Sequence, residues 1–470
     1  MRTTISSGEN GHSYIKLYGR AGCSPVLLLY NRFMDKNQTV ELKITDMTSD
    51  GRGAGRAHGM ACFVDGAVAG DTVLARITRV KKSYCLAATE TIIKSSPDRR
   101  EPYCEYMGEC GGCPFGLLTD EAENRLKEKH VYDKLVRIAG IEIPKVRHIL
   151  RAARPFNYRN KAVMSVDESG RVGFIARAGS RVIDCKTCAL QAPSVEVCAE
   201  ALRTFIACEN IGCIKRMTVK TAFATGEVMV ILEISGKGIP GWEKFVMMID
   251  DALTGDYSLE SVTLVDGNGR CRVLAGRRTI TDELCGLKFE ISPLSFYQVN
   301  HDMTEKLYET ALRYAGLTGA ETILDLYCGI GTIGLSAARS GAAKVIGVES
   351  AKEAVIAANR NAVINGTANA VYECGMAETV VPELISNGIK PDVVILDPPR
   401  RGCDAALIDS VAKATPKRIV YVSCDPATLA RDVRKFIDNK YEFIEATPVQ
   451  MFLHTGHIEV VTLLTRTAKQ

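Results

Sequence analysis

A cysteine stands where the sequence predicts the end of a buried strand. The apolar run "RIVYV" (418–422) has the composition of such a strand, and "VSCDPATLARD" (422–432) continues through Cys424 into an Asp-Pro pair and a helical pattern. A thiol at this place is either inert packing or a nucleophile held at the mouth of an α/β sheet. Because a thiolate can bond covalently to a substrate, the other motifs must decide between the two.

A glycine-rich turn further upstream predicts a nucleotide-type cofactor. The segment "ETILDLYCGIGTIGLSAA" (321–338) reads as strand, turn and helix, and Gly329, Gly331 and Gly334 satisfy the G-x-G-x-x-G pattern. Glycines there let the backbone approach a ligand and let the helix pack close to the strand. The next predicted strand ends at Glu349, where a carboxylate suits two ribose hydroxyls. Alone, the pattern fits a nicotinamide dinucleotide as well as S-adenosylmethionine.

Two aspartates indicate that the cofactor is S-adenosylmethionine and not a nicotinamide dinucleotide. Asp325 lies at the end of the first strand, ahead of the glycines, which gives the D-x-x-x-G-x-G form usual in methyltransferases. The segment "PDVVILDPPRRG" (391–402) then places Asp397, two prolines and Arg400 at the end of a later strand. A strand followed by a turn would account for the Asp-Pro-Pro alone. Its order after the glycine-rich turn is what indicates a methyltransferase.

The residue after the two prolines narrows the choice of methyl acceptor. A tyrosine there would stack on a base whose amino group is methylated, but this chain has Arg400. Cys424, one strand later, suits uracil carbon 5, because a thiolate that adds to carbon 6 turns carbon 5 into a nucleophile. A base must then remove the carbon-5 proton. Glu459 in "MFLHTGHIEVV" (451–461) is the candidate, since its apolar neighbours should raise the pKa of its carboxyl group. Two nearby histidines are alternatives: His454 and His457.

With these motifs the sequence resembles the RNA uracil-5-methyltransferases, a family that makes 5-methyluridine. Five segments occur in the family's order: "SFYQVN" (295–300), "DLYCGIGT" (325–332), "DPPRRG" (397–402), "VSCDPATLARD" (422–432) and "HTGHIE" (454–459). The resemblance implies that Cys424 is the nucleophile and Glu459 the proton-abstracting base. It also implies residues that bind S-adenosylmethionine: Gln298, Tyr327, Gly329, Gly331, Thr332, Glu349 and Asp397. The chain departs from the family at Gln450 and Leu453, where Asp and Pro are usual.

A group of cysteines predicts a metal centre upstream. Cys104, Cys110 and Cys113 follow the pattern C-x5-C-x2-C, which rarely packs as an inert core. A closed site needs a fourth thiolate, for which Cys185 and Cys188 are the choices. Four thiolates suit an iron–sulfur cluster or a structural zinc, and spacing alone does not choose. Members of the same family that modify 23S ribosomal RNA carry a [4Fe–4S] cluster with this spacing. The resemblance therefore implies such a cluster here, with Cys188 as the fourth ligand and Cys185 as the alternative.

Length and composition indicate how many domains the chain has and where it is located. At 470 residues the chain is long for one core, so two or three domains are expected. No apolar run reaches the ~18–20 residues of a membrane helix. The 17 cysteines, in a large chain with no export signal, predict reduced thiols and a cytosolic location. The net charge of +4 permits an RNA partner without arguing for one. Nothing demands more than a monomer.

Four regions are expected along the chain, and together they predict an α/β fold. Residues 1–33 are an extension, with Met34 near the real start. Residues 34–96 show short alternating strands typical of a small β-barrel, which resembles the RNA-binding TRAM domain. Residues 97–290 form a mixed α+β central domain with the cluster. Residues 291–470 alternate helix and strand, which predicts a Rossmann-like, S-adenosylmethionine-dependent methyltransferase domain.

Several segments suit contact with RNA. In the barrel, a basic, glycine-rich turn (48–59) is either a solvated turn or an RNA-binding surface; its basic residues are Arg52 and Arg56, and Lys81 and Lys82 add charge nearby. The segment "RPFNYRNKA" (154–162) resembles a family element and suits phosphate contact and base stacking. A flipped uracil is expected near Phe296 and Arg400. The barrel and the cluster together imply 23S ribosomal RNA. Transfer RNA as substrate, or a non-catalytic RNA-binding assembly factor, are the alternatives.

Overall fold

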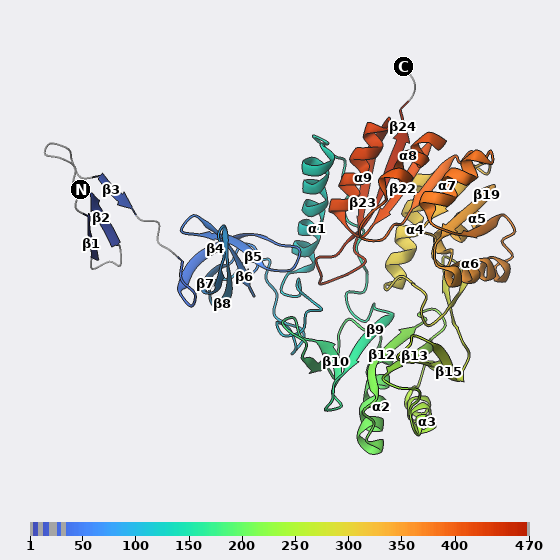
Figure 1. Cartoon of the computed structure of the whole chain (residues 1–470), viewed down its shortest axis with the longest axis horizontal. Coiled ribbons are helices and arrows are strands. Elements are labelled where there is room, and N and C mark those ends of the chain that lie inside the picture. Colours follow the sequence, from blue (N-terminus) through green and yellow to red (C-terminus); the bar gives the residue numbers. More distant parts are fainter. Residues whose placement is uncertain (1–2, 8–12, 18–25, 30–33, 468–470) are drawn as a thin grey trace. The chain divides into compact units, whose positions relative to one another are not determined.

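The structure is a computed structural model that describes residues 3–7, 13–17, 26–29 and 34–467 (Figure 1). The chain divides into two compact units, one of residues 1–101 with 117–119 and the other of residues 102–116 with 120–470. At its start three short strands form an antiparallel sheet: β1 (Thr3–Ser7), β2 (Ser13–Leu17) and β3 (Val26–Leu29). The remainder of the predicted extension, residues 1–33, lies outside the described residues.

The small barrel predicted from the sequence is a closed sheet with the order β4-β5-β6-β8-β7. Its strands are β4 (Thr39–Met47), β5 (Gly53–Ala57), β6 (Met60–Asp65), β7 (Thr72–Val80) and β8 (Tyr84–Lys94). Strand β5 lies inside the glycine-rich segment that was predicted to be a turn, so that prediction is wrong. Glycine is required there because a Cβ on Gly55 would lie 2.6 Å from the carbonyl oxygen of Lys43. The glycines thus let β4 and β5 approach closely enough to close the barrel.

The second unit contains a seven-stranded, mostly antiparallel sheet with the order β11-β10-β9-β12-β13-β14-β15. Its strands are β9 (Lys161–Val166), β10 (Val172–Ile175), β11 (Val182–Asp184), β12 (Ile214–Thr221), β13 (Glu227–Ile234), β14 (Ser258–Val265) and β15 (Cys271–Gly276). Two helices, α2 (Pro193–Glu209) and α3 (Trp242–Ala252), share its core, in which Phe205 and Phe245 are fully buried. This sheet is the mixed α+β part predicted from the sequence.

The second unit also contains a mostly parallel sheet with the order β20-β19-β18-β21-β22-β24-β23. Its strands are β18 (Thr322–Leu326), β19 (Lys344–Glu349), β20 (Ala370–Cys374), β21 (Val393–Leu396), β22 (Arg418–Ser423), β23 (Tyr441–Val449) and β24 (Glu459–Arg466). Strand β24 runs antiparallel to both of its neighbours. A hairpin of β16 (Ile280–Leu284) and β17 (Leu287–Ile291) precedes this sheet in the chain.

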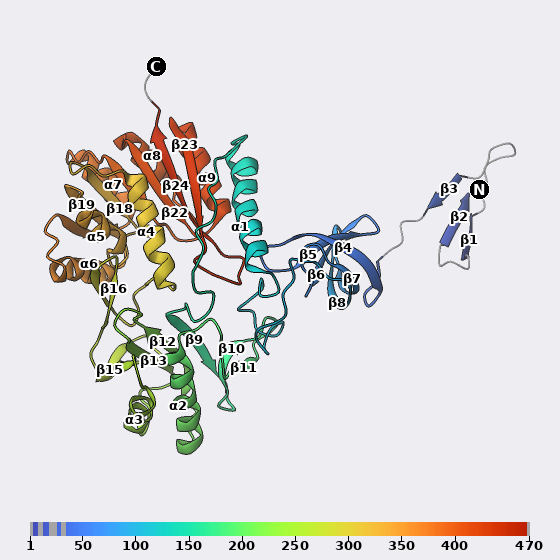
Figure 2. The same cartoon turned by 180° about the vertical axis from the view of Figure 1, so that it is seen from behind.

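Helices cover both faces of the parallel sheet (Figure 2). One face packs on α4 (His301–Ala315), α5 (Thr332–Arg339) and α6 (Lys352–Ile364). The other packs on α7 (Ala377–Ser386), α8 (Ala405–Ala414) and α9 (Pro426–Asp438). This arrangement confirms the predicted α/β fold with a Rossmann-like domain at its C-terminal end.

The helix predicted over residues 119–140 is confirmed as α1 (Asp120–Lys134) with a π-helical turn (Leu135–Ala139). Gly140 ends it with a φ of 72°, the left-handed value that favours glycine. Although α1 precedes the central sheet in the chain, it lies beside α9 against the parallel sheet (Figures 1 and 2). Within the described part of the chain, no helix is long and apolar enough to cross a membrane.

Candidate active site

Cys424 lies immediately after β22, at the edge of the sheet where the parallel strands end. Asp425 begins α9 by accepting hydrogen bonds from the N–H groups of Ala427 (2.8 Å) and Thr428 (3.0 Å). This cap fixes the turn that carries the thiol, because it satisfies N–H groups that a helix start leaves unpaired. The strand, Asp-Pro turn and helix predicted around Cys424 are all confirmed.

Strand pairing brings Glu459 close to Cys424. In the antiparallel ladder of β22 and β24, Ser423 pairs with Val460. Cys424 follows Ser423 and Glu459 precedes Val460, so both residues lie at this end of the ladder, and the charge of Glu459 acts on the Cys424 thiol. Glu459 is only 4% exposed, and its Oε2 has no hydrogen-bond partner among the described residues. A thiol and an unsatisfied carboxyl group thus share one end of the sheet.

Burial and the neighbouring charges change the pKa of both the Cys424 thiol and the Glu459 carboxyl group. Burial raises the pKa of the Cys424 thiol to about 11, and the carboxylates of Glu459 and Asp397 add to the rise while Arg400 opposes it. Burial and the neighbouring Asp397 raise the pKa of Glu459 well above its ordinary value, and Arg400 again opposes the change. Burial also raises the pKa of Asp397 to about 7. The site therefore holds acidic groups that keep their protons more readily than in water, beside one cation.

The glycine-rich turn forms the second half of the site, at the end of β18. Gly331 is the N-cap of α5 with a φ of 84°, and its carbonyl oxygen accepts a hydrogen bond from Tyr372 Oη at 3.2 Å. Asp325 is fully buried, and neither of its carboxylate oxygens has a hydrogen-bond partner among the described residues. At the end of β19, Glu349 accepts the N–H of Gly329 at 3.2 Å. A buried, unsatisfied carboxylate beside a glycine cradle fits a ligand with amino and hydroxyl groups.

The other residues expected to bind the cofactor surround this cradle or are anchored near it. Tyr327 has a φ of 63°, and its hydroxyl donates to Glu378 Oε1 at 3.0 Å. Thr332 Oγ1 lies 2.6 Å from the hydroxyl oxygen of Tyr308, a buried residue of α4 that the sequence did not single out. Gln298 is buried, and its backbone carbonyl oxygen accepts a hydrogen bond from Asn160 Nδ2 at 2.8 Å. Tyr308 could not be identified from the sequence, because a single tyrosine in an amphipathic helix gives no sign that it contacts an expected cofactor-binding residue.

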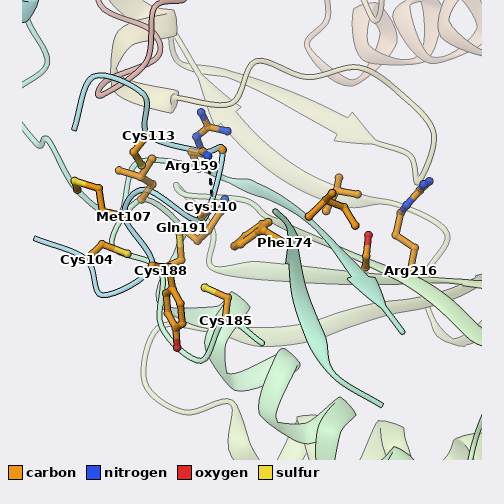
Figure 3. Close-up of a pocket in the computed structure, with 17 residues that line it drawn as sticks. Cys104, Met107, Cys110, Cys113, Arg159, Phe174, Cys185, Cys188, Gln191 and Arg216 are labelled. Carbon is orange, nitrogen blue, oxygen red and sulfur yellow. Dashed lines mark hydrogen bonds between the residues drawn. The ribbon is translucent and has the colours of Figure 1, made fainter. Parts of the chain in front are cut away.

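The cysteines predicted to bind metal line a separate cavity of about 420 Å³. Figure 3 shows the sulfur-bearing side chains gathered on one side of it, with Arg216 on the other; the cysteines are Cys104, Cys110, Cys113, Cys185 and Cys188. None of the cysteines in the described ranges forms a disulfide. Burial raises the pKa of the Cys110, Cys113 and Cys188 thiols, so without metal they hold their protons. Cysteines from two separate segments therefore line the same cavity.

The geometry of the cysteines does not match a site for a single metal ion. Over the part of the chain that the structure describes, no three His, Cys, Asp or Glu side chains are placed to hold a metal ion. Cys185 is engaged differently from the others, since its thiol donates to the carbonyl oxygen of Thr187 at 3.1 Å.

Two segments expected to contact RNA are partly occupied by protein contacts. Tyr158 is 5% exposed and its hydroxyl donates to the carbonyl oxygen of Leu453 at 3.1 Å, so stacking of this ring on a base is excluded. Arg154 forms an ion pair with Asp302 at 2.9 Å. In the barrel, Arg52 pairs with Asp50 (2.9 Å) and with a second aspartate, Asp65 (3.2 Å), which leaves it little net charge to offer a phosphate.

The fold and the site define a class: a Rossmann-like methyltransferase with a glycine cradle for S-adenosylmethionine beside a thiol and a carboxyl group. Comparison with known proteins agrees. Residues 280–467 match the tRNA (uracil-5-)-methyltransferase family, and residues 35–88 match the TRAM domain. The chain is 40% identical over 446 residues to an uncharacterized RNA methyltransferase of Caldanaerobacter subterraneus subsp. tengcongensis, covering 91% of this chain and 98% of the relative. A Clostridium tetani RNA methyltransferase, also uncharacterized, is 38% identical over 92% of this chain and 97% of its own.

A solved structure agrees as well. The tRNA (uracil-54, C5)-methyltransferase of Pyrococcus abyssi, in complex with S-adenosyl-L-homocysteine, has a TM-score of 0.72 and 26% identity. The match covers 91% of this chain and 100% of that enzyme. The present chain belongs to the S-adenosylmethionine-dependent RNA uracil-5-methyltransferases, and its barrel is a TRAM domain.

Proposed function

We propose that this protein transfers a methyl group from S-adenosylmethionine to carbon 5 of a specific uridine in RNA, through a covalent bond between Cys424 and carbon 6 of the uracil. The observation that supports the proposal is the pairing of Ser423 on β22 with Val460 on β24, because Cys424 and Glu459 are the neighbours of this pair at the same end of the sheet as the glycine-rich turn. A nucleophile and a base on one side of a flat ring are what the chemistry requires.

In the proposed reaction, Cys424 acts as the nucleophile and Glu459 as the base. The thiolate of Cys424 adds to carbon 6, and the ring electrons move to form an enolate that makes carbon 5 nucleophilic. S-Adenosylmethionine supplies the methyl group that carbon 5 takes, and the sulfonium becomes a thioether. Glu459 then removes the carbon-5 proton, after which the bond from carbon 6 to Cys424 breaks and the thiolate leaves. Burial raises the pKa of Glu459, which makes the ionised carboxylate a stronger base than in water.

The residues around Cys424 and Glu459 suit thiolate attack, base binding and cofactor binding. Burial raises the pKa of Cys424, and the cation of Arg400 opposes this rise, so Arg400 favours the thiolate that must attack. Phe296 is 67% exposed close to Gln298 in the chain, and it offers a ring on which a flipped base could stack. Gln298, Tyr327, Thr332 and Glu349 would hold the cofactor together with Asp397 and the glycines.

Two variants and one modified substrate test this mechanism. A Cys424→Ala variant should lose methylation and all covalent RNA adducts. A Glu459→Gln variant should still methylate but accumulate adduct, because proton removal is blocked. RNA containing 5-fluorouridine should trap the wild-type protein, since the fluorine at carbon 5 cannot leave as a proton does. Turnover by both variants would overturn the mechanism.

For the RNA, we propose 23S ribosomal RNA as the substrate. Support comes from the combination of a TRAM barrel with a cavity lined by five cysteines. Transfer RNA is the second candidate, because the Pyrococcus abyssi enzyme of similar fold acts on uracil 54 of tRNA. Mapping of 5-methyluridine in ribosomal and transfer RNA from a strain that lacks this protein decides between them. Loss of the base from transfer RNA alone would overturn the first choice.

We further propose that the cavity holds a [4Fe–4S] cluster bound by Cys104, Cys110, Cys113 and Cys188. Cys188 is preferred to Cys185 because the latter's thiol is engaged by a carbonyl group of its own turn. The cluster would tie the segment at 104–113 to the central sheet, and free cysteines suit a reducing, cytosolic location. Anaerobically purified protein should contain about four irons and absorb visible light. Colourless protein that contains zinc, or no metal, would contradict this.

A further inference from the structure

A buried ion pair on α1 meets the loop that precedes Glu459. Glu123 and Lys127 stand one turn apart, and 2.6 Å separates Glu123 Oε1 from Lys127 Nζ. Both side chains are 0% exposed. Burial of two charges costs free energy that their attraction hardly recovers, so such a pair is weak evidence of a purely stabilising role.

Both members of the pair also bind the backbone of the loop. The carboxylate of Glu123 accepts the N–H of His454 with both oxygens, at 2.9 and 3.0 Å. Lys127 Nζ donates to the carbonyl oxygen of Phe452 at 2.8 Å. We call this arrangement of Glu123 and Lys127 the α1 clip. It holds an acceptor and a donor together by their opposite charges and presents them to two backbone groups of complementary polarity.

The backbone at this turn is strained and needs such support. His454 has a φ of 63°, in the left-handed region that residues other than glycine seldom adopt. Tyr158 Oη supports the same turn through the carbonyl oxygen of Leu453. The shape of residues 452–454 therefore depends on contacts from outside the loop.

A change in this turn would reach Glu459 more directly than Cys424. Only residues 455–458 join His454 to Glu459, the first residue of β24. Cys424 instead lies between β22 and the capped start of α9, and the hydrogen bonds of the α1 clip named above go to the loop and not to these elements. The clip thus bonds directly to the loop that leads to Glu459, whereas it reaches Cys424 only through neighbouring elements such as the paired strands β22 and β24.

We propose that Glu123 and Lys127 are positioning residues for the proton-removal step. This inference rests on the proposed covalent mechanism, in which Cys424 makes the adduct and Glu459 resolves it. The α1 clip sets the carboxylate of Glu459 where the carbon-5 proton lies after methyl transfer. Its loss leaves adduct formation and methyl transfer intact and slows the release of methylated RNA.

The test compares Glu123→Gln and Lys127→Met with Glu459→Gln in the full-length protein. Rapid mixing with RNA and S-adenosylmethionine gives the rate constant for formation of the covalent adduct and the rate constant for its decay. We expect a decay constant about tenfold lower or more in both clip variants, because misplacement by about 1 Å can cost that much, with adduct formation close to wild type. Both constants report on folded enzyme only, so a smaller folded fraction does not imitate this result.

The matched control is Glu445→Gln. Glu445 is a nearly buried carboxylate of β23 whose ion-pair partners, Lys145 (2.6 Å) and Arg147 (2.7 Å), lie outside residues 452–454. It should leave the ratio of the two constants unchanged. Equal losses in formation and decay, or decay at the wild-type rate, in both clip variants would overturn the inference. Failure of the proposed function looks different: the wild type would form no adduct, and Cys424→Ala would keep its turnover.

Discussion

At the active site, the thiol of Cys424 and the carboxyl group of Glu459 affect one another's protonation. A carboxylate beside a thiol disfavours the thiolate, and Glu459 is the first of the two carboxylates that raise the pKa of Cys424 after burial. Glu459→Gln removes this like charge, so we expect the thiolate to form at lower pH. The rate of adduct formation on 5-fluorouridine RNA, followed from about pH 6 to 10, should therefore rise earlier in the variant. A profile that is unchanged, or displaced to higher pH, would contradict this coupling.

Individual residues of the site could be found from the sequence, but their arrangement could not. Motifs identified Cys424 and Glu459 because each has a distinctive local sequence. That the two lie close together depends on the pairing of Ser423 with Val460, which no local pattern encodes. His454, the alternative base, is fully buried and stacks on Phe156 with ring centroids 5.3 Å apart, so it lies in the packing of the loop.

At the scale of elements, close packing beneath the cofactor cradle depends on a glycine in β19. A Cβ on Gly347 would lie 2.2 Å from a ring carbon of Tyr372, whose hydroxyl binds the carbonyl oxygen of Gly331. Gly347→Ala should therefore destabilise the protein by about 2 kcal/mol or more, as measured by urea denaturation. Adding Tyr372→Leu should recover part of this loss, since the smaller side chain makes room. Additive effects of the two changes would show that this contact is not the cause.

A buried lysine of the central sheet supports a loop of the methyltransferase domain. Lys220 on β12 is 5% exposed, and its Nζ donates to the carbonyl oxygens of Ser292 and Ser295, each at 2.8 Å. These bonds hold the segment that leads into Gln298. Lys220→Met should weaken S-adenosylmethionine binding about tenfold, because the segment that leads into Gln298 loses both hydrogen bonds to the central sheet. Titration calorimetry measures the effect, and Lys161→Met, a change at the neighbouring lysine, should leave the affinity within about threefold of the wild type.

The elements whose pattern is local were predictable, and those that depend on distant contacts were not. Helix α1 was read correctly from its acidic start and Gly140, but nothing in its sequence marks α9 as its neighbour. Strand β5 was mistaken for a turn because glycine usually signals one. Its glycines are required because the backbone of β4 packs too close for a side chain. This tertiary contact overrides the local preference of glycine for turns.

At the scale of the whole molecule, strand register brings two basic residues of the TRAM barrel, Arg56 and Lys82, to the same end of neighbouring strands. Arg56 on β5 pairs with Ala61 on β6, and Ala61 pairs with Tyr84 on β8, two positions after Lys82. Arg56 and Lys82 are both exposed, whereas Arg52 is bound to aspartates. Of the basic residues noted in the barrel sequence, these two are therefore the ones best placed to meet RNA phosphates.

Phosphate contacts of this kind would show in the salt dependence of RNA binding. Each contact releases counterions, so the slope of log affinity against log salt should become shallower by about 0.7 to 0.9 for each cation removed. Arg56→Ala with Lys82→Ala should thus lower the slope by about 1.5 and leave S-adenosylmethionine affinity intact. The charge-conserving pair Arg56→Lys with Lys82→Arg should keep the wild-type slope, because the term depends on charge and not on shape. If the alanine pair also keeps that slope, this end of the barrel does not touch the RNA backbone, and recognition must reside elsewhere.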